Sequence, residues 1–347
     1  MADVSLRDFD SAPPADWLRR EAHELAGLLD GPTLCRVAGE APDPLFVSCL
    51  LHGNEPSGWD ALRELFRRHA GRRLPRTLVF LIGNVAAAAR RQRRLPGQPD
   101  FNRVWPDAAG RRADDSPEAE QMARLAAEVL AMAPIASIDI HNNTGANPHY
   151  GCVNELTPQT LDLAGRFSDI ALHFSYPTGV QTMAFIGHCP AVTIECGQPG
   201  WQPGVERAAD FLDDCLRRPP APDSPARRPR LYRTAATIRF PESVRFTTDP
   251  AMPGEAAFAL APGIEQLNWV EAAAGTELGR FLNARGDGPR ALALAGRDTG
   301  ARWLRSDGDR LVTARTVTPA MLTTDPDVIR SDCLCYLLER VDEGLAA

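Results

Sequence analysis

Between residues 45 and 218, short apolar runs alternate with longer segments of helical spacing. The apolar runs are nearly continuous, which is typical of strands buried on both faces of a parallel sheet. We therefore predict an α/β fold with a mostly parallel, mixed sheet and helices on both faces. The predicted strands are 45–51, 77–84, 135–140 and 191–196, and the predicted helices are 58–70, 116–133, 157–172 and 204–218.

The pattern changes after this region. The stretch RRPPAPDSPARRPR (217–230) is rich in proline and charge, as expected of a linker. Beyond it, short β-type runs are broken by Gly, Pro and Asp, which indicates a smaller β-rich domain. We expect an α/β domain over 1–217, a linker over 218–230 and a C-terminal β-rich domain over 231–347.

Composition narrows the possible functions. With 347 residues, 44% of them hydrophobic, the chain can bury a sizeable core, and its net charge of −7 argues against nucleic-acid binding. No segment approaches the roughly 18 apolar residues of a membrane span, and the acidic N-terminus lacks the apolar core of a signal peptide. We predict a cytoplasmic protein that acts on a small molecule and binds neither nucleic acid nor membrane. The sequence leaves the oligomeric state open, a homo-oligomer included.

Cysteine usage agrees with that compartment. The eight cysteines include no C-x-x-C pair, so we predict that most are small, buried and reduced side chains.

Polar side chains follow several of the predicted strands where each strand ends. His52 directly follows the first strand and starts the motif HGNE, which also holds Glu55. His141 follows the third strand in DIHNNTG, and Glu195 lies at the end of the fourth in TIECGQPG. Because ligands of open α/β sheets bind beyond the carboxyl ends of the strands, we expect these groups to lie close together.

Two histidines and a carboxylate match the ligand set of catalytic zinc, which leaves a fourth position open for water. Glu195 would then supply a base beside that water. Each motif alone has a more ordinary explanation, since His-x-x-Glu on a loop is usually a solvated turn and a single histidine after a strand is usually hydrogen-bonded. Their conjunction predicts a metal centre with one zinc ion per chain.

The motifs also resemble those of a known family. HGNE, the segment GNVAAAARRQRRLPGQPDFNRVWPD (83–107), DIHNNTG and TIECGQPG resemble the zinc carboxypeptidase superfamily. The similarity is greatest to its aspartoacylase and succinylglutamate desuccinylase branch, and it covers about residues 45–215. It implies a carboxypeptidase-like fold and a zinc-dependent amidohydrolase that cleaves the non-peptide carbon–nitrogen bond of an N-acyl amino acid. The β-rich tail is similar in kind to the second domain of that branch.

By position, the resemblance implies that His52, Glu55 and His141 bind zinc and that Glu195 is the general base and acid. Amide hydrolysis needs a nucleophile at neutral pH, and zinc lowers the pKa of bound water to about 7. Zinc and an arginine can stabilise the oxyanion that forms. A glutamate that takes a proton from water can return it to the leaving nitrogen.

The substrate contacts follow from the same resemblance. Asn102 and Arg103 would hold the carboxylate of the amino-acid half, which a planar guanidinium suits well. One arginine of the run Arg90, Arg91, Arg93 and Arg94 would polarise the scissile carbonyl. The run lies farther from Asn102 than in the family's pattern, so spacing does not separate Arg93 from Arg94. We favour Arg94, and interpret Arg90 and Arg91 as part of a solvated loop.

Three further residues have two interpretations each. Asp139 lies two residues before His141, where it would either hold the second nitrogen of that imidazole or be a buried structural carboxylate. His149 and Tyr150 lie in GANPHYG (145–151), which is either a loop that touches substrate or a plain surface loop.

Three functions therefore compete. The first is deacylation of an N-acyl amino acid, and the second is a metallocarboxypeptidase that shares the metal site but acts on small peptides. The third is a non-catalytic module that binds a metal or ligand, which the presence of both the ligands and Glu195 disfavours.

Overall fold

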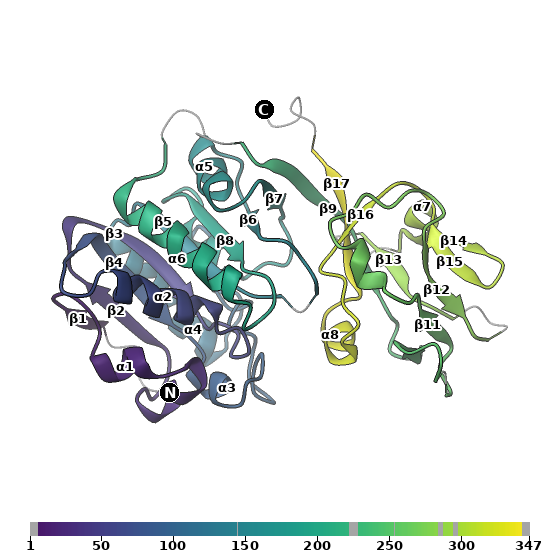
Figure 1. The fold of residues 1–347 in the computed structure, drawn as a ribbon, viewed down its shortest axis with the longest axis horizontal. Coiled ribbons are helices and arrows are strands. Elements are labelled where there is room, and N and C mark those ends of the chain that lie inside the picture. Colours follow the sequence, from purple (N-terminus) through teal and green to yellow (C-terminus); the bar gives the residue numbers. More distant parts are fainter. Residues whose placement is uncertain are drawn as a thin grey trace. The chain divides into compact units, whose positions relative to one another are not determined.

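The computed structural model describes residues 6–143, 145–221, 228–252, 254–283, 287–293 and 298–341. By its contacts the chain divides into two units. Unit 1 consists of Met1–Asn143 and His149–Arg230, and unit 2 consists of Thr144–Pro148 and Leu231–Ala347. In Figure 1, unit 1 runs from purple to green and unit 2 from green to yellow.

Unit 1 is built on one mixed sheet, with its strands in the order β1-β2-β4-β3-β5-β8-β6-β7. The central strands β4, β3, β5 and β8 run parallel to one another, whereas β2 and β6 are antiparallel to β4 and β8. This arrangement confirms the predicted mostly parallel sheet. The strands are β1 (Leu6–Phe9), β2 (Thr33–Val37), β3 (Gly39–Cys49), β4 (Leu74–Ile82), β5 (Ala136–His141), β6 (Tyr150–Val153), β7 (Ile170–His173) and β8 (Ala191–Glu195).

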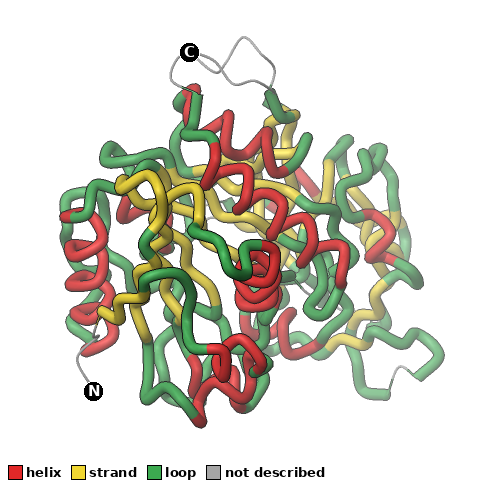
Figure 2. The backbone as a smooth tube through the Cα atoms, turned by 60° about the vertical axis from the view of Figure 1, so that its left-hand side comes forward, coloured by secondary structure: helices red, strands yellow, loops and turns green. Residues whose placement is uncertain are grey.

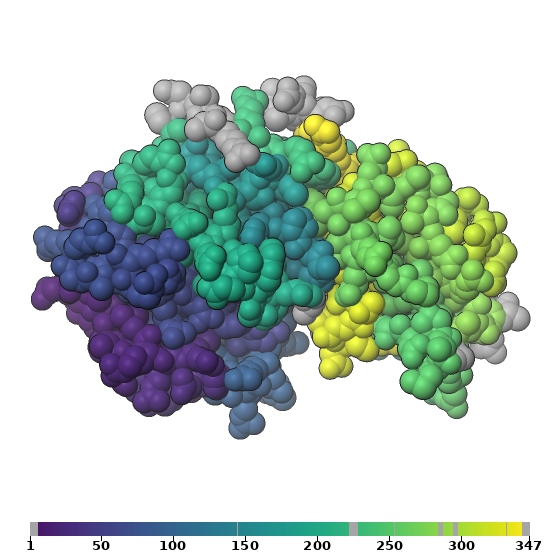
Figure 3. All heavy atoms as spheres, viewed as in Figure 1, coloured from purple at the N-terminus to yellow at the C-terminus, as the bar shows by residue number. Residues whose placement is uncertain are grey.

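Helices lie on both sides of these strands (Figure 2). The helices α2, α5 and α6 pack on one face, and the atoms of α2 and α6 form a closed layer in the space-filling view (Figure 3). The other face carries α4 and η2. The helices are α1 (Ala15–Arg19), η1 (Ala22–Gly27), α2 (Ser57–Arg68), α3 (Val85–Ala89), α4 (Pro117–Ala131), α5 (Pro158–Phe167), η2 (Gln181–Phe185) and α6 (Gln202–Arg217).

The apolar run of β3 shows why the central strands are buried on both faces. Phe46 points into a core with Val79 of β4 and Met122 of α4. On the other face, Cys49 lies against the start of α2, where a Cβ atom on Gly58 would come within 2.6 Å of its own Cβ. A strand with helices on both sides has no solvent-facing positions, so its sequence shows no alternation.

Most predicted elements are confirmed, within a few residues at their ends. Ser116 caps α4 as its position before Pro117 suggests, accepting a hydrogen bond from the Ala119 N–H at 3.1 Å. The predicted helix over 157–172 is wrong beyond Phe167. There the backbone becomes extended at Ser168, and Ile170–His173 pairs with β6 instead. Strands β1, β2 and β6 were not predicted.

Unit 2 is β-rich, as the sequence predicts. One sheet has the strand order β10-β11-β12-β15-β14, and a second group consists of β9, β17 and β16, with β13 paired to β9. The strands are β9 (Arg230–Arg239), β10 (Phe246–Thr247), β11 (Phe258–Leu260), β12 (Glu277–Phe281), β13 (Arg290–Leu292), β14 (Leu304–Asp307), β15 (Arg310–Thr313), β16 (Thr318–Ala320) and β17 (Cys335–Arg340). The short helices are η3 (Ile264–Leu267), α7 (Gly300–Trp303) and α8 (Pro326–Ser331).

The division between the units falls at the end of the predicted linker. Helix α6 ends at Arg217 and β9 begins at Arg230, while residues 222–227 of the linker lie outside the described residues. The segment Thr144–Pro148 groups with unit 2, although it lies within the predicted first domain. Within unit 2, the Asn147 Oδ1 atom accepts a hydrogen bond from the Met321 N–H at 2.9 Å.

Two predictions about the chain's environment can be compared with the structure. All eight cysteines are buried and none forms a disulfide. In the part of the chain that the structure describes, no helix has the length and apolar character needed to cross a bilayer.

The close approach of α2 to the sheet gives a stability prediction. In Gly58→Ala the new Cβ would lie 2.6 Å from Cys49 Cβ and 3.1 Å from Ile140 Cβ, so the helix must shift. We expect a loss of about 1–3 kcal/mol in the free energy of unfolding, measured with urea. Gly27→Ala is the control, because no atom lies within 4 Å of its Cβ position. Equal effects of the two substitutions would contradict this packing.

Candidate active site

The predicted metal ligands come together at the carboxyl ends of β3 and β5. His52 lies in the turn after β3, Glu55 lies just before α2, and His141 is the last residue of β5. The three residues are only 4–6% exposed, and one nitrogen or oxygen atom of each side chain lies within 4.8 Å of the others. This buried His-Glu-His group could hold a metal ion.

The Glu55 carboxylate lies between the two imidazoles. Its Oε1 is 2.8 Å from His52 Nδ1, and its Oε2 is 2.7 Å from His141 Nδ1. The Asn142 N–H also donates to Oε2, at 3.0 Å. Burial alone would raise the pKa of Glu55, but the two imidazoles hold it below its ordinary value. The carboxylate therefore stays charged and joins both histidines.

The other nitrogen of each imidazole meets a second carboxylate. His52 Nε2 is 3.0 Å from Asp100 Oδ1, and His141 Nε2 is 2.6 Å from Asp139 Oδ2. Burial opposes charge on Asp100, but the His52 hydrogen bond and nearby cations lower its pKa. Both interpretations of Asp139 hold, because it is fully buried and also bonded to His141. Such carboxylate–imidazole pairs orient histidine ligands in metal sites.

Glu195 occupies the strand next to His141. The two residues are register partners in the parallel pair β5–β8, so their side chains leave the sheet on the same face. Asn143 Nδ2 donates to Glu195 Oε2 at 3.2 Å. Burial raises the pKa of the Glu195 carboxyl to about 7, against the opposing effects of His141 and Asn143. A carboxyl group with a pKa near neutrality can both accept and release a proton.

Asn142 fastens these segments together, a role that the sequence analysis did not identify. Its Nδ2 donates to Ser57 Oγ at 2.9 Å and to Gly197 O at 2.8 Å, and its Oδ1 accepts the Ser57 N–H at 3.2 Å. The residue thus links the start of α2 to the turn after Glu195. Its place directly after a ligand in DIHNNTG was the only sequence signal.

Of the arginines in the run 90–94, Arg93 lies at the cluster, whereas the favoured Arg94 does not. Arg93 binds Asp100 through Nε and Nη2, and its Nη1 lies 3.8 Å from Glu55 Oε1. Arg94 is exposed and donates to Gln98 O at 2.9 Å. Of the two arginines that spacing does not separate, the structure thus brings Arg93 and not Arg94 to the cluster. Arg90 and Arg91 are exposed, as a solvated loop predicts.

The two residues expected to hold the substrate carboxylate differ in their surroundings. Asn102 is 6% exposed, and its Oδ1 accepts the Gln181 N–H at 2.9 Å. Arg103 is half-buried, and its Nη1 donates to Asn102 O at 2.7 Å. Only Arg103 thus has a partly exposed polar group.

His149 and Tyr150 also have different places. Tyr150 is the register partner of Glu195 in the antiparallel pair β6–β8, and it is fully buried. The His149 ring packs instead against Phe167 of α5 and Trp201, at centroid distances of 5.8 and 4.8 Å. Because α5 covers the other face of the sheet, the structure favours Tyr150 over His149 as a neighbour of the site.

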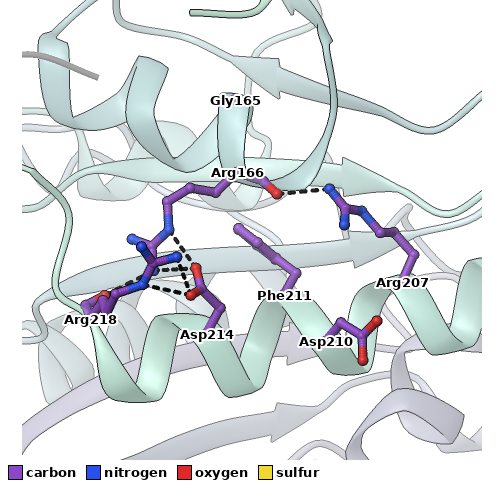
Figure 4. Close-up of a pocket in the computed structure, with 7 residues that line it drawn as sticks. All are labelled: Gly165, Arg166, Arg207, Asp210, Phe211, Asp214 and Arg218. Carbon is purple, nitrogen blue, oxygen red and sulfur yellow. Dashed lines mark hydrogen bonds and ion pairs between the residues drawn. The ribbon is translucent and has the colours of Figure 1, made fainter. Parts of the chain in front are cut away.

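A separate hollow of about 340 Å³ lies on α5 and α6 (Figure 4). Arg166 and Arg218 both pair there with Asp214, and Arg207 donates to the backbone oxygens of Arg166 and Phe167. Its charged groups thus already bind protein atoms, and none of the predicted site residues lines it. The lining residues are Gly165, Arg166, Arg207, Asp210, Phe211, Asp214 and Arg218.

A comparison with models of known families finds one match, and the matched region includes the residues of this site. Residues 42–202 match the model of the succinylglutamate desuccinylase/aspartoacylase catalytic domain. This match agrees with the branch that the motifs resemble. No curated protein matches the chain.

Several solved structures share the fold over most of the chain. Succinylglutamate desuccinylase from Chromobacterium violaceum has 18% identity, a TM-score of 0.53, and coverage of 87% of this chain and 86% of that one. Murine aminoacylase 3 has 15% identity and a TM-score of 0.55, with coverage of 88% and 97%. The product-bound ectoine utilization protein EutE (DoeB) from Ruegeria pomeroyi has 15% identity and a TM-score of 0.58, with 88% of each chain covered. These likenesses confirm the predicted fold class.

Proposed function

We propose that this protein, whose residues 42–202 match the model of the succinylglutamate desuccinylase/aspartoacylase catalytic domain, is a zinc-dependent hydrolase. It would cleave the amide bond of an N-acyl amino acid. The observation that carries the proposal is the buried group of His52, Glu55 and His141 with Glu195 on the adjoining strand, facing the same way.

The residues present fit a zinc ion. An imidazole binds metal through its unprotonated nitrogen, and Nε2–H groups directed at Asp100 and Asp139 would leave both Nδ1 atoms for the metal. Both Nδ1 atoms already point at the Glu55 carboxylate. Two imidazoles and a carboxylate are the usual protein ligands of catalytic zinc, with one position left open. We therefore propose one Zn²⁺ per chain, held by His52, Glu55 and His141.

A bound zinc ion would supply a nucleophile at neutral pH by lowering the pKa of water, and it would polarise a carbonyl group. Glu195 would take a proton from the attacking water and return it to the leaving nitrogen. The acyl carbon–nitrogen bond is then replaced by a carbon–oxygen bond, which gives a carboxylate and a free amine. Asn143 holds the Glu195 carboxylate in place for both transfers.

Two arginines would bind charge on the substrate. Arg93 faces the cluster through Nη1, so it would stabilise the negative charge that develops on the carbonyl oxygen. Arg103 would bind the α-carboxylate of the amino-acid half, because a guanidinium presents paired donors to a carboxylate. Tyr150 would support Glu195 from the neighbouring strand β6.

A metallocarboxypeptidase remains the second candidate, because it would use the same ligands and base. The family match supports the deacylase. A screen of N-acyl amino acids against dipeptides separates the two, and turnover of dipeptides alone would favour the peptidase. The eight buried, unpaired cysteines support our proposal of a reducing, cytoplasmic location.

The metal ligands give the first functional prediction. Purified protein should hold about one zinc ion per chain, as metal analysis would show, and His141→Ala should lose most of it. His69→Ala is the control, because His69 is also buried but binds Asp213 on α6 at 2.6 Å. Full zinc retention in both His52→Ala and His141→Ala would rule out this site.

The role of Glu195 as a proton shuttle gives the second functional prediction. Glu195→Gln keeps the shape of the side chain and removes the base, so kcat should fall by roughly 10²–10⁴-fold. Zinc content and the free energy of unfolding should stay near wild type. The exposed Glu206→Gln on α6 should leave kcat unchanged. Near-normal turnover by Glu195→Gln would reject the mechanism, whereas loss of folding would favour a structural role.

The different positions of Arg93 and Arg94 give the third functional prediction. Arg93→Ala should lower kcat by roughly 10²–10³-fold, since it removes a donor from the developing oxyanion. Arg94→Ala removes a neighbouring guanidinium that points away from the cluster, so its kcat should match wild type. The reverse order of effects would restore Arg94 as the residue that polarises the carbonyl.

A further inference from the structure

The start of α2 takes its cap from another element. Pro56 stands at the N-cap position of this helix, and its side chain makes no cap hydrogen bond. The Ser57 N–H instead donates to Asn142 Oδ1 at 3.2 Å, although the two residues are 85 positions apart. The first N–H groups of a helix have no partner within the helix, so this bond satisfies one of them. The start of α2 is therefore fastened to the end of β5.

The amide of Asn142 is held in a single orientation. A backbone N–H can only donate, so the atom that faces the Ser57 N–H must be the oxygen. The Nδ2 group then directs its two hydrogens at Ser57 Oγ, 2.9 Å away, and at Gly197 O, 2.8 Å away. Asn142 is 4% exposed, so little water reaches these bonds. One side-chain conformation thus joins the start of α2 to the turn after Glu195.

Asn142 lies on the opposite face of the sheet from the metal ligand before it. Side chains alternate along β5, so Ile140 and Asn142 point to the face that α2 covers, whereas His141 points to the other face. The contact of Ile140 with the Cβ position of Gly58 on α2 agrees with this direction. A substrate bound at His141 would meet the other face, so any effect of Asn142 on it passes through neighbouring residues.

The turn after Glu195 is held through one carbonyl oxygen. Gly197 O accepts the Asn143 N–H at 3.1 Å as well as Asn142 Nδ2. Gly197 has a positive φ of 77°, so the chain leaves the direction of β8 at this residue. Glu195 lies two residues earlier, and its Oε2 accepts Asn143 Nδ2 at 3.2 Å. Asn142 and Asn143 therefore fix the backbone and the side chain at the end of β8.

We infer that Asn142 is a positioning residue, which sets Glu195 relative to Glu55 and so to the metal of the proposed function. Glu55 lies two residues before Ser57 and Glu195 two residues before Gly197, and the Asn142 amide bonds to both Ser57 and Gly197. Proton transfer needs its two partners at hydrogen-bond distance, and a misplacement of about 1 Å can cost roughly 10²-fold in rate. The inference rests on the proposed function, which makes Glu195 the base.

The first test needs neither metal nor activity. Backbone amide hydrogen exchange is followed by mass spectrometry in metal-free wild type, Asn142→Ala and Ser57→Ala. In Asn142→Ala, peptides over 54–60 and 193–199 should both exchange roughly 10-fold faster, because both regions lose a hydrogen bond. Ser57→Ala is the matched variant, since it removes the bond to Oγ and leaves the one to Gly197 O, so only 54–60 should change. Unchanged exchange over 193–199 in Asn142→Ala would overturn the link.

The second test separates support of the base from support of the metal. Asn142→Ala keeps the backbone N–H that donates to Glu55, so zinc affinity, measured in competition with a chelator, should stay near wild type. With an N-acyl amino acid, its kcat should fall by roughly 10–100-fold while KM changes little, and Ser57→Ala should lower kcat less. Wild-type kcat, or a loss of zinc affinity as large as the loss of kcat, would overturn the inference.

A double substitution shows whether Asn142 acts through Glu195. Glu195→Gln already removes the base, so adding Asn142→Ala to it should lower kcat little further. Effects that multiply would show that Asn142 acts on another part of the reaction, and they would overturn the inference alone. A wild type that binds no zinc or does not hydrolyse N-acyl amino acids would overturn the proposed function, whatever the exchange experiment shows.

The free energy of unfolding of each variant, measured with urea, shows whether it folds. Should Asn142→Ala fail to fold, Asn142→Ser removes the amide with a smaller loss of buried volume and is used in its place. Its hydroxyl lies one bond from Cβ, so it is too short to bond Ser57 and Gly197 together. A lower free energy of unfolding with wild-type kcat in either variant would show a structural role alone and reject the positioning role.

Discussion

The Glu55 carboxylate is the group on which the rest of the site depends. It joins His52 to His141, which is 86 residues from it in sequence, so it fixes the turn after β3 to the end of β5. A buried carboxylate is destabilising unless charges and hydrogen bonds surround it, and Glu55 has two imidazoles, the Asn142 N–H and Arg93 around it. The loops of the site therefore adopt conformations that supply the hydrogen bonds and positive charges required by this buried carboxylate.

The need for positive charge around buried carboxylates also bears on metal binding. Glu55, Asp100 and Asp139 are carboxylates within one buried cluster, and Glu195 stands beside it. Arg93 lies at this cluster and offsets part of its negative charge. A divalent ion would bring positive charge to this cluster, and it would bind the two Nδ1 atoms that face Glu55 in their unprotonated form. The charge of the cluster thus suits the metal ion that its His-Glu-His group could hold.

Sequence patterns predicted the parts of this site that lie on regular structure. His52, His141 and Glu195 lie at or just after the carboxyl ends of strands buried on both faces. Such strands are visible in the sequence as continuous apolar runs, and their carboxyl ends meet at one edge of the sheet. Strand β7 was missed because Ile170–His173 continues the helical spacing of α5, and only pairing with β6 makes it a strand. The sequence could not show that pairing. It also could not show that Asn102 turns toward Asp139, since that depends on Gln181, which lies 79 residues away.

The choice between Arg93 and Arg94 shows why motif spacing fails in loops. In strands and helices a fixed period ties sequence position to side-chain direction, but a loop has no such period. Here Arg91 has a positive φ of 51°, and the Arg93 carbonyl accepts the Gly53 N–H at 3.1 Å, beside His52. That approach requires glycine, because a Cβ on Gly53 would lie 2.2 Å from Ala88 N and 2.7 Å from Gln92 O. The glycine of HGNE thus lets the arginine loop lie against the His-Glu-His group, and the hydrogen bond from its N–H to the Arg93 carbonyl holds that loop beside His52.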